Sequence, residues 1–124
     1  MSIRRLSQLQ WFGFLVGGPL WFAEFMLAET TSEATCNPGS AHWGLPHDAL
    51  QLALMLFAAV VVAASGVASA IVLRATYDLD EQDDPPPGRI HFFAAAVCAG
   101  NVVFLVIILL TGIGTIVDRL CHQA

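Results

Sequence analysis

The stretch that decides the fold is "ALQLALMLFAAVVVAASGVASAIVL", residues 49–73, which contains no charged side chain. A bilayer core about 30 Å thick requires about 20 consecutive apolar residues in a helix that crosses it. Lipid offers no hydrogen-bond partners to the backbone, so a segment of this kind has to be helical. We therefore predict a transmembrane helix over residues 49–73.

Two further apolar segments, residues 11–30 and 90–117, meet the same length requirement. Of the 124 residues, 56% are hydrophobic and 12% are charged, whereas a soluble domain carries about 25% charged residues. The predicted fold class is an all-α membrane protein with three transmembrane helices, forming a single unit over residues 1–124. The five basic residues are all arginine, which argues against nucleic-acid binding.

The arginines predict the orientation of the chain in the membrane. Three spans place Arg4, Arg5, Arg74 and Arg89 on one side and Arg119 on the other. The positive-inside rule then puts the N-terminus in the cytoplasm and the C-terminus outside. This predicts a multi-pass protein of the bacterial cytoplasmic membrane. A secretory signal over "MSIRRL" and the following apolar run is the alternative, and we favour an anchor helix.

Small residues mark the expected helix-packing positions. In the first span, a glycine pair followed by proline predicts a kink or a close neighbour. The second and third spans carry pairs of small residues four positions apart, which let helix backbones approach closely. The predicted packing residues are Gly17, Gly18 and Pro19 in the first span, Gly66 and Ala70 in the second, and Ala96 and Gly100 in the third.

Cysteine and histidine gather at the predicted outer face. Cys36 and Cys121 each follow a helix end in an oxidising compartment, so we favour a disulfide between them. Isolated interfacial histidines are the second interpretation. Metal binding is the third, because the spacing matches no established motif. Its ligands would come from Cys36, His42, His47, Cys121 and His122.

Two polar residues lie inside predicted spans. A carboxylate in lipid is costly unless it is paired, protonated or hydrated, so Glu24 is a candidate functional residue. We consider a proton relay, a polar contact with a larger neighbour, or a bond to Asn101 or Thr111. A location near the interface is the structural alternative. We expect Asn101 to bond between helices.

The stretch "GGPLWFAEFMLAETTSEATC", residues 17–36, resembles a family of small hydrophobic proteins with three or four helices. These are encoded beside bacterial haem-copper terminal oxidases. The resemblance rests on Gly18-Pro19, Trp21 and Cys36 and covers the first third of the chain. It implies an accessory or assembly role near an oxidase, with haem and copper held by partner subunits and no cofactor bound by this chain alone.

The expected function is therefore a non-catalytic accessory subunit of a bacterial respiratory complex, most simply a cytochrome c oxidase-type terminal oxidase. Its partners would be larger membrane subunits and lipids. One alternative is an assembly or metal-handling factor that uses the outer cysteines and histidines. Another is a proton-relay subunit that uses Glu24. The sequence does not identify a lipid or quinone ligand.

Overall fold

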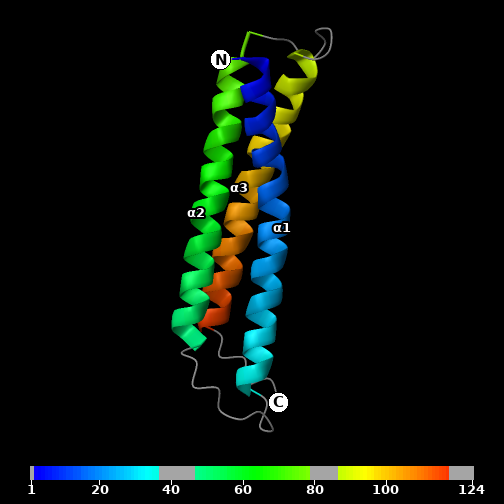
Figure 1. Cartoon of the computed structure of the whole chain (residues 1–124). Coiled ribbons are helices and arrows are strands. Elements are labelled where there is room, and N and C mark those ends of the chain that lie inside the picture. Colours follow the sequence, from blue (N-terminus) through cyan, green and yellow to red (C-terminus); the bar gives the residue numbers. More distant parts are fainter. Residues whose placement is uncertain (1, 37–46, 79–86, 118–124) are drawn as a thin grey trace.

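The computed structural model describes residues 2–36, 47–78 and 87–117, which form three long helices. Helix α1 covers Ile3–Cys36, α2 covers His47–Ala75 and α3 covers Pro87–Val117. Consecutive helices run in opposite directions and lie side by side as an elongated bundle (Figure 1). The start of α1, the end of α2 and the start of α3 therefore share one end of the bundle.

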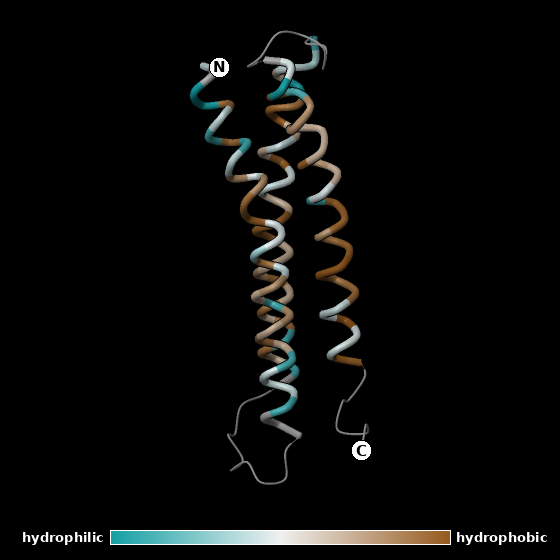
Figure 2. The backbone as a smooth tube through the Cα atoms, turned by 90° about the vertical axis from the view of Figure 1, so that its right-hand side faces the viewer, coloured by the Kyte–Doolittle hydropathy of each residue, from teal (hydrophilic) through white to brown (hydrophobic). Residues whose placement is uncertain are grey.

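All three helices are long and apolar enough to cross a membrane, over Arg4–Glu33, Asp48–Ala75 and Gly88–Val117. At 1.5 Å per residue, each extends more than 40 Å by a rough estimate and so exceeds the hydrocarbon thickness. Figure 2 shows hydrophobic residues prevailing along the helices and hydrophilic ones near the N-terminus of α1. The prediction of three helices long and apolar enough to span a membrane is thus confirmed.

Helix α1 extends beyond its predicted span of residues 11–30 at both ends. At its start, the Arg5 amide donates to the Ser2 hydroxyl at 3.4 Å, in the manner of an N-cap. Near its end, the hydroxyls of Thr30 and Ser32 donate to carbonyls four residues earlier, Met26 and Ala28, at 2.8 Å each. Polar residues that look like loop in the sequence therefore continue the helix.

The interior of the bundle consists of two apolar clusters. One, at the end that holds the N-terminus, contains Leu6, Val72, Ile90 and Ala94. The other lies further along and contains Met55, Ala58, Val62 and Ile108. The outward surfaces of all three helices carry large apolar side chains, as lipid contact requires.

The Gly-Gly-Pro sequence does not end α1, which continues through Pro19 as one helix. The predicted close neighbour is present at Gly17. A β-carbon built there would lie 2.8 Å from Asn101 Oδ1 and 3.0 Å from the Phe104 ring. Glycine at this position therefore lets α1 lie directly against α3.

Candidate functional site

A buried polar cluster joins all three helices near the middle of the bundle. Asn101 Nδ2 on α3 donates to the carbonyl oxygen of Gly13 on α1 at 3.1 Å. Ser65 Oγ on α2 lies 3.0 Å from the same carbonyl and 3.3 Å from Asn101 Oδ1. Ser69 Oγ donates to the Ser65 carbonyl at 3.0 Å. Ser65 and Ser69 are almost wholly buried, and Asn101 nearly so.

The cluster depends on glycine at position 13. A β-carbon there would collide with Ser69 Oγ and would lie 3.2 Å from Val97. Because Gly13 has no side chain, its carbonyl is open to Asn101 and Ser65 from neighbouring helices. Gly13 and Gly17 form a small-xxx-small pair, which is the pattern in the sequence that could have identified this contact.

A second polar contact joins α1 to α2 near the other end. Gln51 Nε2 lies 2.8 Å from Thr31 Oγ1 and 3.4 Å from the Ala28 carbonyl oxygen. In the structure α2 begins at His47, so Asp48 lies inside the first turn and the Gln51 side chain crosses to α1.

Glu24 lies on the buried face of α1, one turn before Ala28. Its side chain is 4% exposed, and its Oε2 atom is buried with no hydrogen-bond partner among the described residues. Trp21 Nε1, three residues earlier, is likewise buried and without a partner in the described part of the chain. Within this part, the hydrogen bonds of Asn101 go to Gly13 and Ser65 rather than to Glu24.

The residues around Trp21 explain its burial. Its ring stacks on Phe25 and lies tilted against Phe104 of α3, with a centroid separation of 6.2 Å in each case. A buried carboxylate oxygen and a buried indole N–H on one helical face form an acceptor and a donor that the described residues leave unused.

Thr76 and His91 tie α2 to α3 at the end that carries the N-terminus. Thr76 Oγ1 lies 2.9 Å from the Val72 carbonyl and 3.0 Å from His91 Nδ1. The Thr76 hydroxyl either donates to the Val72 carbonyl and accepts from His91 Nδ1 or donates to His91 Nδ1, according to the imidazole tautomer.

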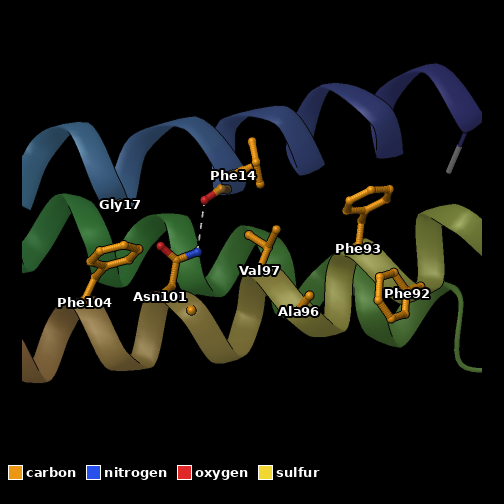
Figure 3. Close-up of a pocket in the computed structure, with 10 residues that line it drawn as sticks. Phe14, Gly17, Phe92, Phe93, Ala96, Val97, Asn101 and Phe104 are labelled. Atoms are coloured by element: carbon orange, nitrogen blue, oxygen red, sulfur yellow. Dashed lines mark hydrogen bonds between the residues drawn. The ribbon is translucent and has the colours of Figure 1, made fainter.

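A groove runs between α1 and α3, and we call it the α1–α3 groove. Its inner part has a volume of about 220 Å³, and its floor includes Gly13, Gly17 and Gly100. Figure 3 shows the Phe93 and Phe104 rings rising from α3 toward α1, with Asn101 and Val97 between them. A wider outer part, about 510 Å³, continues toward the end of the bundle and includes Ser7, Gln10 and Arg89.

The predicted packing residues divide into two groups. A β-carbon at Gly66 would meet Asn101 at 3.6 Å, and Ala70 is half-buried, so this pair lies at the contact of α2 with its neighbours. Ala96 is exposed, and a β-carbon at Gly100 would meet no atom within 4 Å. Ala96 and Gly100 line the open α1–α3 groove, so the packing of another helix on them stays a prediction.

Three of the predicted outer residues, His42, Cys121 and His122, lie outside the described residues. For Cys36 and His47 the structure describes the backbone but not the side chain. Cys36 is the last residue of α1 and His47 the first of α2. The proposed disulfide and metal ligands thus stay predictions. In the described part of the chain, no three His, Cys, Asp or Glu side chains are grouped to hold a metal ion, and Cys98 is a free thiol.

Comparison of the chain with protein-family models, with curated proteins and with solved structures gave no match.

Proposed function

We propose that this chain is a non-catalytic accessory subunit of a larger membrane complex. On the resemblance of residues 17–36, we propose that this complex is a bacterial respiratory terminal oxidase. The observation that supports this most directly is a stripe on the outward face of α1. Its large members are Trp11, Leu15, Phe22 and Met26, whose side chains are between 42% and 58% exposed.

Gly18 interrupts this stripe at its centre. With 3.6 residues per turn, Gly18 falls with the four large side chains inside an arc of about 80°. A β-carbon at Gly18 would meet only the Phe104 ring, at 3.7 Å, which is ordinary contact. Lipid would cover apolar side chains equally well, but a notch between bulky residues suits the backbone of another helix. We propose that a helix of the larger subunit docks here.

The test is copurification from native bacterial membranes with an affinity-tagged chain. We expect haem-containing subunits to copurify, detected by their visible absorption and by mass spectrometry. Gly18→Leu fills the notch and should abolish copurification. Gly114→Leu is the matched control, because a β-carbon there meets no atom within 4 Å and Gly114 lies on α3, away from the stripe. Recovery of the native chain free of haem proteins would contradict the proposal.

We also propose that the N-terminus lies in the cytoplasm, the C-terminus outside and the chain in the bacterial cytoplasmic membrane. The arginines at the start of α1, the end of α2 and the start of α3 lie at one end of the bundle, which supports this orientation (Figure 1). A C-terminal alkaline phosphatase fusion should be active and a C-terminal green fluorescent protein fusion dark. The opposite pattern would invert the topology.

A proton-relay role for Glu24 is a second candidate, supported by its burial and by the unpartnered Oε2 atom. Glu24→Gln keeps the shape of the side chain and removes its ability to release a proton. A relay requires that this variant lower proton-coupled activity of the parent complex while copurification is retained. Unchanged activity would remove the relay and leave the docking proposal intact.

A further inference from the structure

The α1–α3 groove has the length of one membrane leaflet. Its inner and outer parts share Phe14 and Phe93 in their linings, so they form one continuous depression. From Ile90 to Phe104 the helix rises about 21 Å at 1.5 Å per residue. One leaflet, with its head-group region, is about 21 Å deep, half of the full bilayer thickness. The groove therefore extends from the membrane surface to about the bilayer centre.

The chemistry of the lining changes along this length. At the outer end, Arg89 offers a guanidinium, and Ser7 and Gln10 offer neutral hydrogen-bonding groups. Arg89 is exposed, and it is the charged side chain of the described lining. Deeper in, the walls are phenylalanine and the floor is largely glycine and alanine. The polar group there, Asn101, already bonds to Gly13 and so needs no ligand.

We propose that the α1–α3 groove binds an anionic phospholipid, with its phosphate at Arg89 and one acyl chain lying along Phe93, Ala96 and Gly100. A cationic, hydrogen-bonding mouth above a narrow apolar channel is complementary to a molecule with an anionic head and a hydrocarbon tail. Basic pockets between membrane helices bind anionic head groups in this way. The floor is open at Gly100, where a β-carbon would meet no atom within 4 Å.

The head-group contact is tested on the purified full chain in detergent by native mass spectrometry, with phosphatidylglycerol and phosphatidylcholine as probes. We expect one phosphatidylglycerol to be retained more tightly than phosphatidylcholine. Arg89→Gln should weaken phosphatidylglycerol binding about fivefold, the effect of one basic side chain near a membrane surface. Arg74→Gln is the matched control, because Arg74 lies at the same end of the bundle on α2, outside the lining.

The tail contact is tested by filling the groove. Gly100→Leu should weaken binding of phosphatidylglycerol, whereas Gly114→Leu should not, and circular dichroism verifies that both variants are folded. A β-carbon at either position meets no atom within 4 Å, so neither leucine is forced against the protein interior. The two substitutions differ because Gly100 lines the groove and Gly114 does not.

Four results would overturn the proposal. They are equal binding of the two lipids, equal weakening by Arg89→Gln and Arg74→Gln, and native affinity in a folded Gly100→Leu variant. The fourth is a lipid-free dimer that Gly100→Leu dissociates, since the occupant would then be a second copy of the chain. Because the isolated chain is measured, the outcome does not depend on whether an oxidase is the parent complex.

Discussion

Asn101 is the residue on which the contact of all three helices depends, since it and Ser65 both reach the Gly13 carbonyl. Asn101→Ala removes the bond from α3 and should lower the free energy of unfolding by about 1 kcal/mol, within the range for hydrogen bonds between membrane helices. Unfolding in mixed micelles by added dodecyl sulfate, followed by circular dichroism, measures this. Val102→Ala, next to it but outward-facing, is the control.

The same measurement on Ser65→Ala and on the double variant gives the coupling between the two side chains. Because they lie 3.3 Å apart and share one acceptor, their effects should not add. Strictly additive effects of the two substitutions on the free energy of unfolding would contradict this prediction. They would mean that the hydroxyl and the amide contact the Gly13 carbonyl independently of each other.

Glu24 gives the opposite expectation for stability. Its buried Oε2 has no partner in the described residues, so Glu24→Gln breaks no hydrogen bond at that atom and removes the cost of burying a carboxylate. The free energy of unfolding should stay within about 1 kcal/mol of the native value or rise. Glu29→Gln, on an exposed part of α1, is the control. A marked loss confined to Glu24→Gln would reveal a partner for the carboxylate.

At the scale of the helices, the glycines differ sharply in what surrounds them. A β-carbon at Gly112 of α3 would collide with the Met55 side chain and lie 2.8 Å from its Cβ, so Gly112→Ala should destabilise the bundle by about 1–3 kcal/mol. Gly114→Ala meets open space and should stabilise by up to about 1 kcal/mol through helix propensity. Dodecyl sulfate unfolding of both variants checks the pair, and equal effects would contradict the close contact of Gly112 with α2.

The existence of the helices followed from hydropathy, because only helical segments of this length satisfy their backbones in lipid. Their ends did not follow, since α1 continues past residue 30, where the Ser32 hydroxyl bonds back to the Ala28 carbonyl. Hydropathy scores such residues as polar and cannot detect a hydroxyl that satisfies itself on its own helix.

The partners of each helix face were harder to predict than the helices. Small-residue spacing marked Gly66 and Ala70 at a helix contact but also Ala96 and Gly100, which line an open groove. The pattern states that a close approach is sterically allowed, not which helix makes it. Asn101 was expected to bond between helices and does so, whereas Gly13, its acceptor, has no side chain to reveal the role.

Across the described helices, polar side chains bond in the seams, Glu24 Oε2 and Trp21 Nε1 excepted, while apolar ones cover the outside. The Gly13 cluster joins three helices, Gln51 joins α1 to α2, and Thr76 joins α2 to His91 of α3. Such contacts give a small bundle one fixed arrangement in a solvent that supplies no hydrophobic drive between helices. A fixed bundle with an apolar exterior can present the same α1 stripe to every partner molecule.

The predicted bridge between Cys36 and Cys121 would act on this same scale. Cys36 ends α1, and α3 ends at Val117 at the same end of the bundle (Figure 1). A disulfide there would close a long loop, so its reduction should lower stability by about 2–4 kcal/mol. The chain has three cysteines, and Cys98 is a free thiol. Alkylation of the denatured chain should therefore add one label before reduction and three after it.

Intact-mass spectrometry of protein from native membranes reads these labels directly, and Cys98→Ser, which removes the free thiol, calibrates them. Cys36→Ser and Cys121→Ser should each allow the remaining outer cysteine to react without reduction. Three labels on the unreduced native chain would show that no bridge exists. If those thiols also retain copper or zinc in the undenatured protein, the metal-handling interpretation replaces the bridge, because a thiolate that ligates metal is not oxidised to a disulfide.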